Sequence, residues 1–254
     1  MIASDNPFAD SASLAKEKET LKSSSVSVIS TETAETLVNI PASFTPGRSL
    51  FIDARGKALV RLPTPSSQLE IHIHNPDTSL AYVSTRKSRC SGSSTLSSPE
   101  CGDLLFTEYF FGPNREPRIH ILTGSEKASP EVKIKGKWTS RATNFSLPDG
   151  SVFEWRYVKE CGPDGKKEVL VVLEKFEVSG RKRVAHLLRN KRTRPPNTSR
   201  CTAGNGGELV IGRDTAEVID EPLIVATCLL MLKKEIDRRR AIQACVIFGG
   251  AGSV

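Results

Sequence analysis

From Ser49 onward, the chain consists of short apolar runs separated by Pro, Gly, Asn and Asp. This punctuation is typical of many short β-strands joined by turns. In residues 132–138, apolar residues alternate with Lys133, Lys135 and Lys137, a period of two that buries one face of a strand and exposes the other. The pattern therefore predicts strands with one face in a core and one face in water.

A β-hairpin is predicted around Pro148-Asp149-Gly150, because Pro presets φ for a turn and Gly accepts a positive φ. An apolar run leads into this turn, and the returning strand places Phe153, Trp155 and Tyr157 on one face. Similar runs predict further strands at Leu50–Ile52, Leu59–Leu62, Leu69–His74, Leu80–Ser84, Leu104–Phe111, Arg118–Leu122, Val169–Phe176, Val184–Leu188 and Leu209–Ile211.

These runs amount to about twelve strands. No long helical pattern interrupts them, which favours antiparallel pairing over β-α-β units. No repeat of fixed period is present, so a propeller or a solenoid is not expected. Long loops are expected near residues 86–101, which are rich in Ser, and near residues 190–207, which are rich in Pro and Gly.

One helix is expected near the C-terminus. Asp220-Glu221-Pro222 has the form of a helix start, with acidic residues and Pro in the first turn. Residues 223–232 are apolar on every helical face, whereas residues 233–240 are mostly charged. A helix that is apolar all round must be surrounded by protein or lipid, and this run is about half the ~20 residues needed to span a bilayer. We therefore predict a buried helix over residues 222–245, enclosed by a barrel that has no exposed sheet edges. In this arrangement Leu229→Asp should unfold the domain. The alternative is a helix packed between two sheets.

The domain organisation follows from composition. Residues 1–42 are rich in Ser, Thr, Lys and Glu without a sustained apolar period, so a disordered tail is expected. A single mostly-β (α+β) domain is expected over residues 43–248, followed by a flexible Gly-rich tail at 249–254. Because the sequence shows no signal peptide and no apolar stretch of membrane-spanning length, we expect an intracellular, cytoplasmic protein, with nuclear or peripheral membrane locations as alternatives.

The basic residues are the first candidate site. The formal net charge of +7 favours acidic partners such as anionic lipids, although ordinary solubility explains the same balance. Lys133, Lys135 and Lys137 form a stripe with about 7 Å between successive members. A second run holds no acidic residue and consists of Arg181, Lys182, Arg183, Arg189, Lys191, Arg192, Arg194 and Arg200. The positive potential of such residues attracts anionic head groups and phosphates. The alternative is a solvated strand face and a charged loop without a ligand. Because no aromatic residues alternate with these basic residues, nucleic acid is not an expected partner.

A metal site is the second candidate. Glu70, His72 and His74 share one face of a predicted strand, and His120 can supply a further ligand. The arrangement resembles a cupin, but Pro76-Asp77 stands where that family has a Glu. Apolar residues occupy the opposite face of the strand, so a half-exposed strand with polar residues facing water is the alternative.

Motifs of classical catalysis are absent from the sequence. It contains no G-x-S-x-G, H-E-x-x-H, P-loop or C-x-x-C pattern. The glycine cluster Gly204–Gly207 precedes a predicted strand, whereas a phosphate-binding loop follows a strand and opens a helix. The sequence therefore implies no cofactor and favours a binding or scaffold role over catalysis.

The order of these elements resembles the tubby C-terminal-like barrel, a superfamily that includes tubby proteins, phospholipid scramblases and plant LURP-one-related proteins. Residues Phe145–Arg156 look like the central hairpin of that group. Residues Ala203–Leu209 and the following segment Val225–Arg240 are similar to the end of uncharacterised proteins of filamentous fungi. The resemblance covers roughly residues 45–248.

This resemblance implies a non-enzymatic domain that binds a phosphoinositide or another acidic ligand through basic residues of the barrel wall. No lipid-contacting position is matched residue by residue, and the sequence lacks the anchoring tail and palmitoylated cysteines of a scramblase, so scrambling is not expected. Two alternatives stay open: a metal-dependent β-barrel enzyme using His72, His74 and His120, and a protein-interaction scaffold with an acidic protein as its partner.

Overall fold

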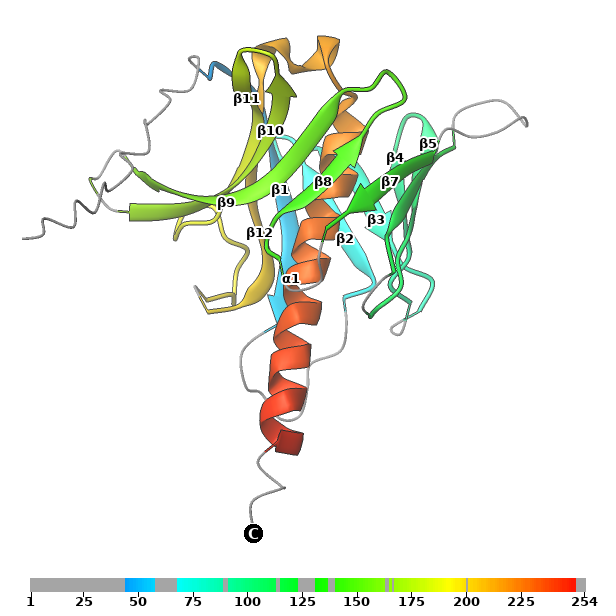
Figure 1. Ribbon diagram of the computed structural model, residues 1–254, viewed down its shortest axis with the longest axis vertical. Helices are drawn as coiled ribbons and strands as arrows, with labels where there is room; N and C mark the ends of the chain where they lie inside the picture. Colours follow the sequence, from blue (N-terminus) through cyan, green and yellow to red (C-terminus); the bar gives the residue numbers. More distant parts are fainter. Residues whose placement is uncertain are drawn as a thin grey trace, which may run out of the picture. The chain divides into compact units, whose positions relative to one another are not determined.

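The computed structural model describes residues 44–249 except 58–67, 89–90, 113–114, 123–130, 137–139, 163–164, 166 and 200, and only the backbone of 246–249. Within this part of the chain, twelve antiparallel strands form a closed barrel with one long helix, α1 (Glu221–Gly249), inside it (Figure 1). The strands are β1 (Pro46–Lys57), β2 (Glu70–His74), β3 (Leu80–Thr85), β4 (Ser94–Ser98), β5 (Gly102–Glu108), β6 (Arg118–Ile121), β7 (Glu131–Lys135), β8 (Thr143–Ser146), β9 (Val152–Cys161), β10 (Lys167–Glu177), β11 (Gly180–Leu188) and β12 (Ala203–Gly212).

Each strand pairs with its neighbours in sequence, and β1 closes the barrel by pairing with β12. At this seam Leu50 lies opposite Leu209, and both side chains are buried. A short 3-10 helix, η1 (Arg213–Glu217), then leads from β12 into α1. Closure leaves no strand with unpaired backbone groups at a sheet edge. The fold class predicted from the sequence is thereby confirmed.

The predicted hairpin is present as β8 and β9. Phe145 lies opposite Phe153, and their rings stack with centroids 5.2 Å apart. The Leu147 amide donates to the Ser151 carbonyl at 2.9 Å across the turn, and Gly150 has a φ of +85°. The turn therefore needs glycine at this position, as the sequence indicated.

Two loops predicted from the sequence contain strand instead. β4 lies within residues 86–101, and β12 begins at Ala203, so that Gly204–Gly207 belong to a strand. The predicted strand Leu59–Leu62 and the two predicted tails, 1–42 and 250–254, lie outside the described residues. Helix α1 begins one residue before the predicted start and extends to Gly249.

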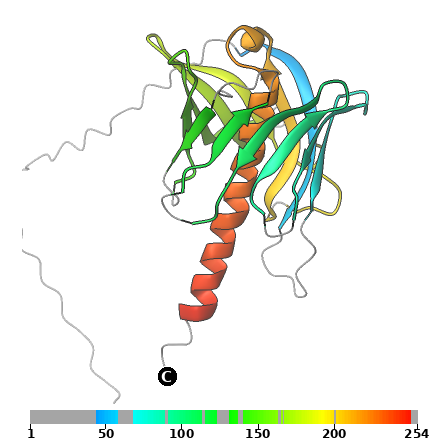
Figure 2. The same cartoon turned by 90° about the vertical axis from the view of Figure 1, so that its right-hand side faces the viewer.

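The first half of α1 fills the barrel interior (Figure 2). Ile224, Val225 and Cys228 have no exposed surface, and they belong to the same core as Trp155 on β9. The hydroxyl of buried Thr227 donates to the Leu223 carbonyl at 2.8 Å, so it needs no partner from the barrel. Burial raises the pKa of the Cys228 thiol to about 12, as expected of a structural core cysteine.

The charged second half of α1 leaves the barrel and is bonded to its rim. Arg189 donates to Glu235 at 2.7 Å, and Lys234 donates to the Thr143 hydroxyl at 3.2 Å. Two further arginines of the helix donate to backbone carbonyls of the loops, namely Arg238 to Ser140 and Arg239 to Cys201. These bonds fix the helix where it emerges. No helix in the described part of the chain is long and apolar enough to cross a membrane.

Ile224→Asp should unfold the domain, because an unpaired carboxylate in the core costs about 3–5 kcal/mol. The matched control is Ile242→Asp on the same helix, where the side chain is 64% exposed. Circular dichroism melts should show a large loss of thermal stability for the first variant and almost none for the second. Equal melting temperatures would contradict the enclosure of α1.

Candidate functional site

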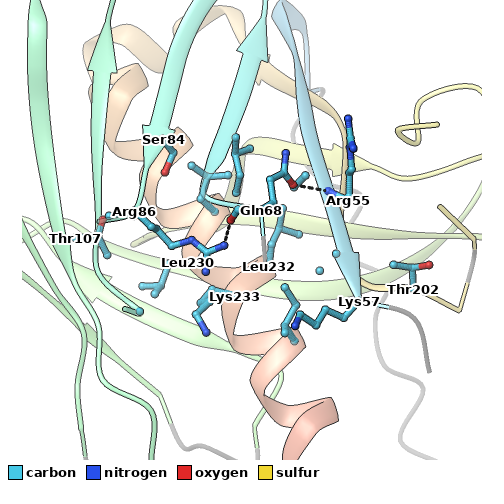
Figure 3. A pocket seen from close by; sticks show the side chains of 18 of the residues that line it. Arg55, Lys57, Gln68, Ser84, Arg86, Thr107, Thr202, Leu230, Leu232 and Lys233 are labelled. Atoms are coloured by element: carbon cyan, nitrogen blue, oxygen red, sulfur yellow. Dashed lines mark hydrogen bonds between the residues drawn. The ribbon is translucent and has the colours of Figure 1, made fainter. Parts of the chain in front are cut away.

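A cavity of about 410 Å³ lies between α1 and strands β1–β5, near the end at which the helix leaves the barrel (Figure 3). Leu229 and Leu230 of the helix line it on one side, and Ile71 of β2 and Leu96 of β4 line it on the other. Leu229 is only partly buried because it faces this space. The helix is therefore not enclosed at Leu229 in the way the sequence suggested.

Packing explains why space remains here. Helix α1 contacts β12 most extensively, and Gly204 of β12, with φ +69°, permits this close approach. A Cβ on Gly204 would lie 2.4 Å from Ile236 Cγ1 and 2.6 Å from the Leu232 carbonyl oxygen. Facing the cavity, the inward positions of β3 and β5 carry the small residues Ser84 and Thr107. A helix drawn toward β12 and small residues on the facing wall leave an unfilled volume.

Besides Arg55, four cations line the cavity, namely Lys57, Arg86, Lys233 and Arg240, and none of the described lining residues is acidic. Lys57 is the last residue of β1, and Arg86 directly follows β3. Figure 3 shows Lys57, Arg86 and Lys233 extending into the space between the helix and the strand ends. Residues from three separate parts of the sequence thus form one basic cluster, which we call the mouth cluster.

Asp237 is the counter-ion of the mouth cluster. It is 1% exposed, and Lys233 Nζ lies 2.8 and 2.9 Å from its two oxygens. Arg240 Nη1 lies 3.3 Å from Oδ1, and the Tyr109 hydroxyl also hydrogen-bonds this carboxylate. One carboxylate therefore faces four cations, which leaves the cavity with an excess of positive charge.

The cations of the mouth cluster are partly removed from water, and several of them repel one another. Burial, followed by repulsion from Arg240 and two other cations, lowers the pKa of Lys57. Burial also lowers the pKa of Lys233, against the opposing attraction of Asp237. No hydrogen bond or ion pair is recorded for Lys57 within the described chain, although Arg86 donates to the Gln68 carbonyl. An anion in the cavity would relieve the repulsion and supply Lys57 with a partner.

The predicted lysine stripe lies elsewhere, on the outer face of the barrel. Lys133 and Lys135 are exposed on β7, and Lys137 lies outside the described residues. Neither of the two described lysines contributes to a described pocket. These two lysines belong to the exposed face of β7.

The second predicted basic run is divided by the structure. Arg181 forms ion pairs with Glu154 at 2.6 Å and Glu174 at 3.4 Å, and Arg183 pairs with Glu160. These two charges are therefore largely neutralised. Lys182 lies beside them on β11, whereas Lys191, Arg192 and Arg194 belong to the loop between β11 and β12.

The three histidines of the metal hypothesis do not meet. His72 and His74 are neighbours on the outer face of β2, with ring centroids 6.1 Å apart, and His72 lies 3.9 Å from Glu70. His120 is on β6, which three intervening strands separate from β2, and there it faces Glu108 at 3.8 Å. The described residues contain no group of three or more His, Cys, Asp or Glu side chains suited to a metal ion.

Sequence analysis missed the whole mouth cluster. The helical part carries a local signal, since Lys233, Asp237 and Arg240 are spaced i, i+4 and i+7 and so share a helix face. Lys57 and Arg86 carry none, because they lie at the ends of separate strands that are far from each other and from the helix in sequence. Only closure of the barrel brings them to the helix.

Comparison of this chain with protein-family models, curated proteins and solved structures found no match. Fold and site therefore define the class: a closed twelve-stranded antiparallel barrel with an internal C-terminal helix and a basic cavity beside the helix exit.

Lys234, beside the mouth cluster, should make stability depend on pH. Burial, reinforced by Arg238, lowers its pKa from 10.5 to about 8. The unfolded chain then binds more protons than the folded one between these two pH values, so the free energy of unfolding should rise with pH across this window. Lys234→Met should remove this contribution, and urea denaturation at a series of pH values measures it. A slope identical to that of the original protein would contradict the argument, and Lys135→Met is the control.

Proposed function

We propose that this chain is a non-enzymatic, tubby-like binding domain whose ligand is anionic and carries phosphate, held by the mouth cluster. The observation that carries the proposal is the group of four cations in one cavity, with only one carboxylate to balance them. Natural proteins rarely bury like charges together without a function, because the arrangement costs stability. The tubby-like assignment is supported by the order of elements, an antiparallel barrel followed by an enclosed apolar helix.

Phosphate suits the chemistry of the cavity. Arg86 offers a planar guanidinium, and Lys57 offers an ammonium group that forms no hydrogen bond or ion pair with the described residues. The opposite side of the cavity is apolar, formed by Leu229, Leu230 and Ile236, and can accept the carbon skeleton that carries the phosphate. Inorganic phosphate therefore probes the charged half of the site alone.

Binding is favoured over catalysis by the composition of the lining. Its described polar residues are cations, amides and hydroxyls, without a histidine or carboxylate to act as a general base. The hydroxyl groups of Ser84, Ser94 and Thr107 therefore lack an activating neighbour among the lining residues.

A protected cavity is a better anion site than the exposed lysine stripe. Cations on an outer strand face keep their hydration and are screened by salt, so each contributes little affinity. The mouth cluster is partly removed from water, as the lowered pKa values of Lys57 and Lys233 indicate. Binding there should persist at salt concentrations that abolish binding to the stripe.

Lys57→Met should weaken binding of inorganic phosphate about tenfold or more, because one charge-assisted hydrogen bond contributes about 1.5–3 kcal/mol. The melting temperature of the unliganded variant should not fall, because the substitution removes repulsion and breaks no bond recorded in the described chain. Isothermal titration calorimetry and thermal melts measure both effects. Lys135→Met is the matched control, and equal effects of the two substitutions would contradict the cavity site.

Leu229→Glu should act as an internal competitor. The new carboxylate enters the cavity close to the cations that otherwise hold the ligand. We expect phosphate binding to be lost while the domain stays folded, in contrast to Ile224→Asp. Titration calorimetry with inorganic phosphate, together with circular dichroism of the same sample, provides the test. A folded variant that binds phosphate as the original protein does would overturn the assignment of this cavity.

A further inference from the structure

A second basic pocket lies on the outer wall of the barrel. This groove of about 370 Å³ runs between β1 and the loop that joins β11 to β12. Three arginines line it, Arg55 from β1 and Arg192 and Arg194 from the loop, and one carboxylate, Asp53, lines it as well. The groove therefore also has an excess of positive charge.

Two buried polar atoms along this groove have no hydrogen-bond partner among the residues that the structure describes. They are Nδ1 of His74 and one terminal nitrogen, Nη1, of Arg194. Buried guanidinium N–H groups are normally satisfied, because leaving one without an acceptor costs free energy. A bound anion would accept from Arg194 Nη1, and its protonated oxygen or a bridging water would satisfy His74.

The loop holds these groups in place before any ligand arrives. Arg194 Nε donates to the Asn190 carbonyl at 3.0 Å, which fixes the guanidinium and leaves Nη1 directed elsewhere. The Asn190 side chain accepts from the backbone amides of Arg192 at 2.8 Å and Thr193 at 3.1 Å. Such a closed turn reduces the entropy lost when the loop binds a ligand.

The groove and the cavity share part of their lining. Arg55, Pro196 and Asn197 line both of them. Asn197 has a φ of +61°, an uncommon conformation for a residue other than glycine, at the point where the two sites adjoin. A single molecule can therefore place one charged group in each site.

We propose that the groove binds a second phosphate group of the ligand whose first phosphate occupies the mouth cluster. The ligand class is then a compound with two or more separate phosphate groups on one compact skeleton, either soluble or as a lipid head group. This inference rests on the proposed function, because it assigns the first phosphate to the cavity.

The test uses the full chain and two probes, inorganic phosphate and inositol hexakisphosphate. The variant Arg192→Met removes a groove charge that lies outside the cavity lining and whose side chain forms no hydrogen bond or ion pair among the described residues. We expect it to weaken inositol hexakisphosphate binding about tenfold or more and to leave inorganic phosphate binding unchanged. Lys191→Met, in the same loop but outside the groove lining, is the matched control and should affect neither probe.

The outcomes separate the two proposals. If Arg192→Met binds inositol hexakisphosphate as tightly as the original protein does, the groove inference is overturned, while the effect of Lys57→Met on inorganic phosphate still decides the proposed function. If Lys57→Met changes the binding of neither probe, the proposed function fails and the two-site ligand fails with it. An equal loss of inositol hexakisphosphate binding in Lys191→Met would show general attraction of a polyanion and would also overturn the inference.

Vesicles distinguish the two sources of such a ligand. Phosphatidylcholine vesicles with and without phosphatidylinositol bisphosphate are sedimented with the original protein and with the Arg192→Met variant. Sedimentation that requires the phosphoinositide and is lost in the variant supports a lipid head group. Binding of inositol hexakisphosphate without sedimentation supports a soluble ligand, and sedimentation that is unchanged in the variant contradicts a role for the groove.

Discussion

The architecture depends on one constraint: a helical segment that is apolar on every side must be kept from water. Residues Leu223–Leu232 have no polar face, and the hydroxyl of Thr227 is satisfied within the helix. A single sheet can cover only one side of such a helix. Twelve strands closed by the pairing of β1 with β12 cover all sides, and closure also removes the exposed edges of the sheet. The length of the barrel and the length of the apolar segment are thus linked.

The same constraint places charge at the mouth of the barrel. Because the helix continues to Gly249, its polar half must begin where the barrel wall ends. Lys233 and Asp237 therefore lie at the boundary between core and water, and burial of Asp237 obliges cations to gather around it. One cation would balance this carboxylate. Lys57 and Arg86 add positive charge beyond what this carboxylate balances, and an ion pair with Asp237 does not account for that surplus.

Local patterns in the sequence carried most of the fold. Alternation in β7, the turn at Gly150 and the apolar run of α1 each reflect a physical rule that acts within a few residues. β4 escaped prediction because only Leu96 of its five residues is apolar, and Ser and Thr clusters are equally typical of loops. β12 escaped in part because its glycines resemble a loop, yet Gly204 and Gly206 are required by the close approach of α1 and of β1. Neither requirement is visible until the partner element is in place.

The candidate site was less accessible, for a related reason. A run of basic residues is easily recognised in a sequence, but consecutive residues of a strand point to opposite faces of the sheet. Such residues can also be paired with acidic residues of neighbouring strands, as Arg181 and Arg183 are. The residues that line the cavity come instead from the ends of different strands, and only closure of the barrel brings them close to one another. Unsatisfied electrostatics is then the better guide: among the described residues, Lys57 forms no hydrogen bond or ion pair inside the wall, and Arg194 Nη1 has no acceptor outside it. Because Arg55, Pro196 and Asn197 line both the cavity and the groove, the ligand with two phosphate groups that we propose would reach both cations at once.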